Sequence, residues 1–365
     1  MKKLLLILLL APFLTVGAHA AYDGAAEDPG FEVGGVTESL PEEALEIGGE
    51  LRLDGSYDTA GALGRLWQRF LDSAAAELRS SCREMAGVFA LILLCAISSS
   101  LVPQQKQSEL IQTAACAAIS LLLAGGVNSL VGEALSVMTD LSNYGSAALP
   151  AVYTAAAASG AAASAPAKYG AACMALDLMM TASQKLILPI VCAVLAMSVC
   201  AGIGENPFLR TGIRLGRKLS ALLLTALTLG FTALLSITGL VSGSADALTV
   251  RAAKAVISTA VPVVGRMLSD AADSVLSAAA LVRNSAGAFG LVAVCAICAG
   301  PFASLAVQRL LLSVTATAAE MTSCGRIARL LNDIAGVMNI LLGLIAAFGF
   351  MLFFCIVAAL RSVGA

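Results

Sequence analysis

The sequence has little charge, few aromatic residues and a single histidine. Only 13% of its 365 residues are charged and 5% are aromatic, while 59% are hydrophobic. A soluble domain carries about 25% charged residues. The composition therefore excludes an ordinary soluble domain and predicts an all-α, polytopic membrane protein.

The scarcity of histidine removes much catalytic chemistry. His19 is the only imidazole, and it lies in a segment that we expect to be cleaved off. The mature chain would then lack Ser-His-Asp and Cys-His catalysis and any His-ligated metal or haem. The sequence also has no Gly-Lys dipeptide, so it has no Walker A loop. We therefore expect a protein that is not an enzyme and binds no metal or cofactor.

The basic and acidic residues nearly cancel. Twenty-two Lys and Arg stand against 24 Asp and Glu, a net charge of −2. Because nucleic-acid-binding proteins present an excess of basic charge, we expect no nucleic-acid partner.

Residues 1–20 have the order of a secretory signal peptide. Lys2 and Lys3 precede an apolar run over 4–14, and Ala18-His19-Ala20 supplies the small residues of a cleavage site. An uncleaved anchor is the alternative, but the apolar run is shorter than the roughly 20 residues of a spanning helix. Cleavage would leave the N-terminus outside the cytoplasm.

Two different segments follow the signal peptide. Residues 21–59 hold eleven acidic residues and one basic residue, Arg52, and we expect an extended exported tail. Residues 60–84 have the apolar periodicity of an amphipathic helix, which either lies in the headgroup layer or packs on other exported protein. The apolar positions of that helix are Leu63, Leu66, Trp67, Phe70, Leu71, Ala74 and Leu78.

Residues 85–365 form the predicted membrane domain. Six uncharged intervals are each long enough for a helix to cross about 30 Å of hydrocarbon. They are 85–105, 110–132, 186–204, 219–245, 284–308 and 334–360. A seventh interval, 141–167, is rich in Ala and Gly, so the chain has six or seven spans. The stretch 310–325, interrupted by Glu320, predicts a half-buried or interfacial helix.

Loop charge leaves two topologies open. If 141–167 does not cross, the basic cluster Arg210–Lys218 is cytoplasmic, together with Arg309, Arg326 and Arg329. If it does cross, all of these move outside. Cytoplasmic loops are enriched in Lys and Arg. We favour the first topology because Arg210–Lys218 is the densest basic cluster close to a span.

Residues 246–283 predict a broken amphipathic segment. Pro262 lacks an amide hydrogen and interrupts a helix, and Gly265 relaxes the backbone one turn later. Such breaks line polar cavities in transport proteins but also occur as packing kinks, and both readings stay open here.

Ionisable side chains within the apolar region are the remaining candidates for chemistry, because each must be paired, solvated or neutral. They are Asp177, Lys185, Glu133, Asp140 and Glu320. Most could mark span ends, and Asp177 fits that explanation least. Cys295 and Cys298 have the spacing of a redox or metal pair but lie within a span without a second pair or a histidine, so we interpret them as small apolar residues.

One stretch resembles a known signature. The run from Ala260 to Leu276 and the run from Leu281 to Gly290 resemble the stage III sporulation protein AE family, which also has a signal peptide, an acidic exported tail and a polytopic C-terminal part. The signature positions, which are candidates to line a path, are Pro262, Gly265, Asp270, Asp273, Asn284, Gly287 and Gly290.

The resemblance implies a non-enzymatic subunit of a sporulation channel, or feeding-tube, complex. Such a subunit would lie in the mother-cell membrane around the engulfed forespore. Its partners would be other membrane proteins of the stage III complex and a forespore-anchored protein across the intermembrane space. The alternative is a self-sufficient secondary transporter in which Asp177 and Glu320 couple a substrate to protons. Carriers commonly pair two broken helices, and only one is predicted here.

Overall fold

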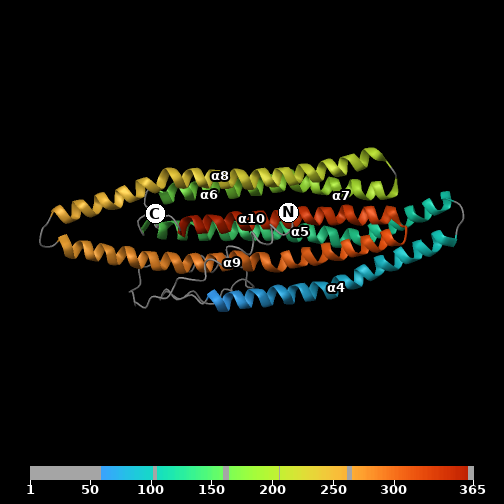
Figure 1. The fold of residues 1–365 in the computed structure, drawn as a ribbon, viewed down its shortest axis with the longest axis horizontal. Coiled ribbons are helices and arrows are strands. Elements are labelled where there is room, and N and C mark those ends of the chain that lie inside the picture. The colour runs from blue at the N-terminus through green and yellow to red at the C-terminus, as the bar shows by residue number, and fades with distance from the viewer. Residues whose placement is uncertain (1–58, 102–104, 159–163, 205, 261–264, 361–365) are drawn as a thin grey trace.

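The computed structural model describes residues 59–101, 105–158, 164–204, 206–260 and 265–360, and within them every regular element is helical. The helices form six long apolar rods, which run back and forth along one axis (Figure 1). In chain order the elements are α4 (Thr59–Leu101), α5 (Gln105–Ala158), α6 (Ser164–Ala182), η1 (Ser183–Ile187), α7 (Leu188–Ile203), α8 (Pro207–Ala260), α9 (Gly265–Met321) and α10 (Gly325–Leu360).

The predicted all-α membrane fold is confirmed, with six apolar rods. Each is long and apolar enough to cross a membrane, and α6, η1 and α7 together make one of them. The candidate spans are Gly64–Leu101, Gln107–Ala158, Ala165–Ile203, Pro207–Leu234, Gly287–Met321 and Gly325–Ala359. A 54-residue helix such as α5 is about 80 Å long. Because hydrocarbon is only about 30 Å thick, the longest rods extend well beyond the bilayer.

Several segments that look separate in the sequence are parts of longer helices. The amphipathic stretch 60–84 and the first span form one helix, α4. The Ala-rich residues 141–158 are the second half of α5, and 310–321 are the last turns of α9 rather than an interfacial helix of their own. The predicted signal peptide and nearly all of the acidic tail lie outside the described residues.

The predicted break at Pro262 lies between two rods. α8 ends at Ala260 and α9 begins at Gly265, and Pro262 itself lies outside the described residues. Figure 1 shows these ends of α8 and α9 extending past the other rods at one end of the molecule. The segment 246–283 thus contains two helical arms of a hairpin, each continuous with a rod of the bundle.

The turn before α8 is encoded locally. Pro207 begins the helix, a position where its missing amide hydrogen has no cost. The side-chain oxygen of Asn206 accepts a hydrogen bond from the amide of Phe208 at 3.0 Å, as an N-cap does.

The turn before α10 ends the preceding helix in a similarly defined way. Ser323 has a φ of 59°, in the left-handed region. The amide of Cys324 donates to the carbonyl of Ala319 at 3.0 Å, which completes a Schellman cap at the end of α9. Figure 1 shows that α8 and α10 both begin at the same end of the bundle.

Helix α10 lies at the centre of the bundle and contacts α5, α6, α7, α8 and α9. Small residues allow its close approaches: a Cβ on Gly343 would lie 2.9 Å from Leu224 on α8, and one on Gly349 would lie 2.9 Å from Cys298 on α9. The buried hydroxyl of Tyr153 on α5 donates to the carbonyl of Cys355 on α10 at 3.0 Å. Such small-residue contacts are typical of helices packed in membranes.

Candidate functional site: an arginine-lined cavity between α7, α8 and α10

The two carboxylates selected from the sequence, those of Asp177 and Glu320, lie at different positions along the axis of the bundle. Asp177 is exposed on α6, near the exposed Met174 and Leu178. Glu320 is exposed in the last turn of α9, where its carboxylate accepts a hydrogen bond from the Asn332 amide at 3.3 Å. About 26 residues of helix separate Asp177 from the end of the bundle that holds Glu320, which corresponds to roughly 40 Å. The structure therefore does not bring the two carboxylates into one site.

The signature residues are distributed along α9. Gly265 begins this helix, and the side chains of Asp270, Asp273 and Asn284 lie outside the described residues.

The two later signature glycines, Gly287 and Gly290, are buried. A Cβ on Gly290 would lie 3.2 Å from Ile356 on α10 and 3.4 Å from the hydroxyl of Tyr144 on α5. Gly287 lies one turn earlier on the same helix. Gly290 thus lets α5, α9 and α10 approach one another. That the signature residues line a path stays a prediction.

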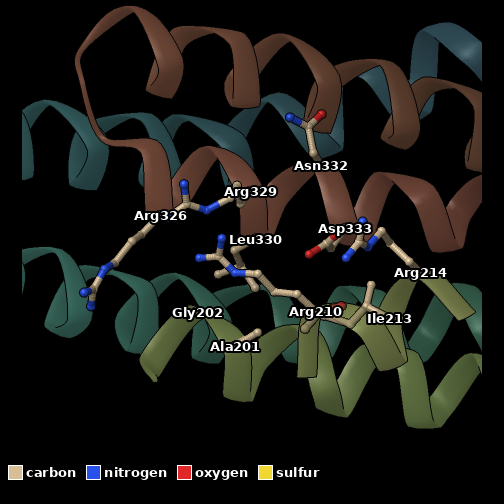
Figure 2. A pocket seen from close by; sticks show the side chains of 11 residues that line it. Ala201, Gly202, Arg210, Ile213, Arg214, Arg326, Arg329, Leu330, Asn332 and Asp333 are labelled. Carbon is tan, nitrogen blue, oxygen red and sulfur yellow. The ribbon is translucent and has the colours of Figure 1, made fainter. Parts of the chain in front are cut away.

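The structure brings together a different set of residues. A cavity of about 380 Å³ opens between α7, α8 and α10, at the end of the bundle where α8 and α10 begin (Figure 2). Its polar lining comes from Ser198 on α7, from Arg210 and Arg214 on α8 and from Arg326, Arg329, Asn332 and Asp333 on α10. Small and apolar residues of α7, such as Gly202, form the opposite wall.

Helical spacing explains why the arginines converge. Arg210 and Arg214 are four residues apart and Arg326 and Arg329 are three apart, so each pair lies on one face of its helix. Figure 2 shows Arg210 and Arg214 extending from α8 toward α10. Because α8 and α10 start from the same end, the two pairs meet across the cavity.

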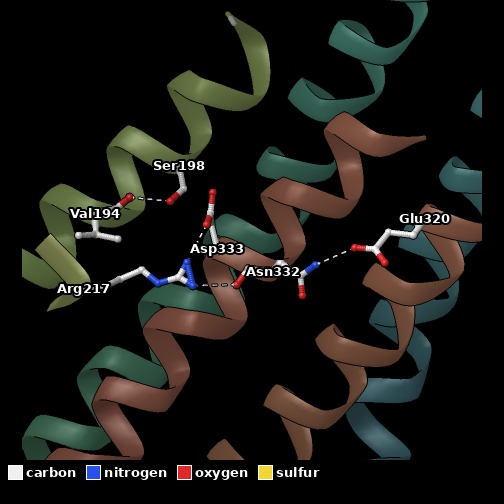
Figure 3. Close-up of polar contacts among 6 residues, drawn as sticks. All are labelled: Val194, Ser198, Arg217, Glu320, Asn332 and Asp333. Atoms are coloured by element: carbon white, nitrogen blue, oxygen red, sulfur yellow. Dashed lines mark hydrogen bonds and ion pairs between the residues drawn. The ribbon is translucent and has the colours of Figure 1, made fainter. Parts of the chain in front are cut away.

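An ion pair joins the walls beside the cavity. Arg217 on α8 donates to the carboxylate of Asp333 at 2.7 Å and to the backbone carbonyl of Asn332 at 3.4 Å (Figure 3). The side chains of Arg217 and Asp333 keep 29% and 25% of their exposure, so water reaches the pair only partly. The pair links α8 to α10. The carboxylate of Asp333, which lines the cavity, is therefore already paired with Arg217.

Arg326 ties α10 to α5. Its guanidinium donates to the hydroxyl of Thr113 at 2.8 Å and lies 4.0 Å from the carboxylate of Glu109. Its side chain is only 14% exposed. Arg210 and Arg329 also have interactions within the protein. The guanidinium groups of Arg210, Arg326 and Arg329 therefore already interact within the protein.

The sequence contains a signal for this site besides topology. Arg210–Lys218, Arg326 and Arg329 act as loop charges in the topology argument. Arg210 and Arg326, however, fall in the first turns of their helices, where the helix dipole disfavours positive charge. Because Arg210 and Arg326 are unfavourable for the helix ends themselves, their placement indicates that they serve another interaction.

The fold and the site define a multi-pass helical membrane protein with a basic cavity at one end of its bundle. A sequence model described as "Stage III sporulation protein AE" matches residues 55–363. The chain therefore belongs to the stage III sporulation protein AE family, which confirms the resemblance of the signature.

A curated relative carries the same description. "Stage III sporulation protein AE" of Bacillus subtilis (strain 168) is 23% identical over 228 residues, which are 62% of this chain and 57% of the relative. The chain thus spans a little over half the length of the curated relative that it matches. No solved structure matches this chain.

Proposed function

We propose that this protein is a non-enzymatic membrane subunit of a sporulation channel complex that links the mother cell with the engulfed forespore. The observation that supports this most is the family match over 55–363, which covers all six rods. The shortage of histidine in the sequence agrees with a role that is not catalytic.

The proposed location is the mother-cell membrane around the forespore, with the N-terminus in the intermembrane space. Because the rods alternate in direction, the start of α4 and the α8–α9 hairpin then lie on the same side of the membrane. The hairpin extends past the other rods and could reach a forespore-anchored partner there. The arginine-lined end would be cytoplasmic, in agreement with the enrichment of basic residues on that side.

Deletion of the gene in the bacterium that encodes it tests this role. We expect vegetative growth to be unchanged and sporulation to stop after engulfment, with heat-resistant spores reduced by several orders of magnitude. An ectopic copy of the gene should restore spore formation, and an affinity-tagged copy should co-purify the other membrane proteins of the complex from sporulating cells. Normal spore counts in the deletion strain would contradict the proposal.

The transporter alternative predicts other results. It requires a growth or uptake defect in vegetative cells, and solute movement driven by a proton gradient in liposomes that is lost on Asp177→Asn. The separation of Asp177 from Glu320 argues against one coupling site that uses both carboxylates.

A further inference from the structure

We propose that one side of α4 lines a water-filled path through the membrane. This side, the charged stripe, consists of the exposed residues Asp72, Ala76, Arg79 and Arg83. Their spacings of three, four and seven residues place them on one side of the helix. A second exposed side of α4 is apolar and carries Trp67, Leu71 and Leu78. A helix that lies between lipid and water presents two such sides.

Contacts with α9 place the charged stripe at the level of the hydrocarbon. Leu66 packs on Val292, and the hydroxyl of Ser73 lies 3.9 Å from the position of a Cβ on Gly300. The two helices therefore run in the same direction, and the charged stripe begins beside the uncharged interval 284–308 of α9. Gly300 is eight residues from the nearer end of this interval, a distance of about 12 Å along the helix.

The central helix α10 gives the same depth. A Cβ on Gly349 would lie 2.9 Å from Cys298 on α9, and Gly349 belongs to the uncharged interval 334–360. Charged side chains at such a depth almost always face the interior of a bundle or a water-filled cavity. Asp72 is too short to reach the headgroups, as a lysine or arginine can. Because Asp72 is exposed at the surface of the bundle, water has to reach it there.

Polar side chains continue on the inner side of α4, in its seam with α5 and α9. The hydroxyl of Ser81 donates to the carboxylate of Glu77 at 2.6 Å. Glu133 on α5 accepts a hydrogen bond from Ser304 on α9 and interacts electrostatically with Glu77. Two carboxylates of like charge repel one another, and water at this seam weakens the repulsion.

A buried amide lies one turn further along the same seam. Gln308 on α9 is 4% exposed, and its carbonyl oxygen has no hydrogen-bond partner among the residues that the structure describes. Its amide nitrogen lies 4.0 Å, and a carboxylate oxygen of Glu84 lies 3.3 Å, from the position of a Cβ on Gly126 of α5. A buried polar atom without a partner is costly unless water satisfies it. The seam and the charged stripe therefore both indicate that water reaches α4 at this depth.

The path runs along the outside of one chain. Within the bundle α4 packs chiefly on α5 and α9 and lies at one edge (Figure 1). The opposite wall of the path is supplied by a neighbouring subunit of the proposed complex. In this respect the path rests on the proposed function, whereas the depth of α4 follows from contacts within the chain.

Reaction with a charged, methanethiosulfonate-type thiol reagent tests the water path. Membranes from sporulating cells are opened so that the reagent reaches both faces, and the exposed native thiols are first replaced by serine. The variants Asp72→Cys and Ala76→Cys place a thiol on the charged stripe. Thiol reagents attack the thiolate, which forms in water and not in hydrocarbon. Both variants should therefore react.

Leu229→Cys on α8 is the matched control. Leu229 is 65% exposed, and it follows Leu224, which lies beside Gly343 of α10. Because α8 and α10 begin at the same end of the bundle, Leu229 has nearly the depth of Gly349. We expect the stripe variants to react about tenfold faster than this control, or more.

Two results would overturn the proposal. Equally fast reaction of Leu229→Cys would show that this level of the bundle is not in hydrocarbon. Protection of both stripe variants would show that lipid or dry protein covers α4. Ala76→Cys removes no charge, so it decides the test if Asp72→Cys does not fold. The labelling needs no spore counts, so failure of the path is distinguishable from failure of the sporulation role, which the deletion tests.

Discussion

Replacing Gly216 by leucine is expected to lower the midpoint of thermal unfolding by roughly 5–10 °C or to prevent folding altogether. At this position the backbone of α8 lies directly against side chains of α7. A Cβ on Gly216 would lie 2.5 Å from a methyl group of Val194 and 3.5 Å from one of Ile190. Val194 is buried and β-branched, so it cannot turn aside without strain. Overpacking of this kind costs about 1–3 kcal/mol and occasionally more.

A matched substitution on the same helix separates packing from other effects of leucine. Gly230 on α8 has no atom within 4 Å of its Cβ position. Gly230→Leu should therefore fold normally and unfold at the wild-type temperature or slightly above it, because leucine favours helix more than glycine does. Both variants can be compared by size-exclusion chromatography after heating in detergent. Equal behaviour of the two would show that α7 and α8 do not pack as described.

Removing the carboxylate of Asp333 is expected to destabilise the bundle by about 1–3 kcal/mol. Breaking a buried pair costs about 3–5 kcal/mol, and an exposed pair is worth less than about 1 kcal/mol. The Arg217–Asp333 pair is one-quarter to one-third exposed, so an intermediate cost follows. Asp333→Ala also leaves Arg217 beside the other arginines with no carboxylate in the described lining.

The double substitution Arg217→Leu/Asp333→Leu should recover most of this loss, since replacing both partners removes the uncompensated charge. Unfolding temperatures of the wild type, Arg217→Leu, Asp333→Leu and the double variant give the coupling between the two side chains. Glu320→Gln serves as a control that keeps an oxygen to accept from Asn332, and it should change little. Strictly additive effects of the Arg217 and Asp333 substitutions would contradict the ion pair.

The membrane fold could be predicted because a long uncharged run has few alternatives to a membrane-spanning helix. The sequence did not show, however, that neighbouring segments are parts of one continuous helix. Glu133 and Asp140 separate 110–132 from the Ala-rich segment in a charge count, but both lie half-buried within the unbroken α5. A charged residue inside a long helix does not reverse the chain, and no Pro or Gly between Asp140 and Glu133 marks a turn there. Hydropathy shows how apolar a segment is but not whether its direction changes.

The cavity could not be predicted because it depends on contacts between distant parts of the chain. Arg217 and Asp333 are 116 residues apart, and only the packing of α8 on α10 brings them together. The sequence pointed instead to Asp177 and Glu320, since charged residues among apolar ones are conspicuous. Their relative depth follows from the lengths of α6 and α7, which the sequence left ambiguous.

In the proposed topology the chain crosses the membrane as six rods, with the arginine-lined end in the cytoplasm. Labelling with a membrane-impermeant maleimide tests it in protoplasts. The exposed native thiols, Cys82, Cys192 and Cys200, are first replaced by serine. Two exposed positions, Ala167 at the start of α6 and Thr211 at the start of α8, lie at opposite ends of the bundle. We predict that Ala167→Cys reacts in intact protoplasts and that Thr211→Cys reacts only after permeabilisation. Reaction of both in intact protoplasts, or of Thr211→Cys alone, would contradict the claim.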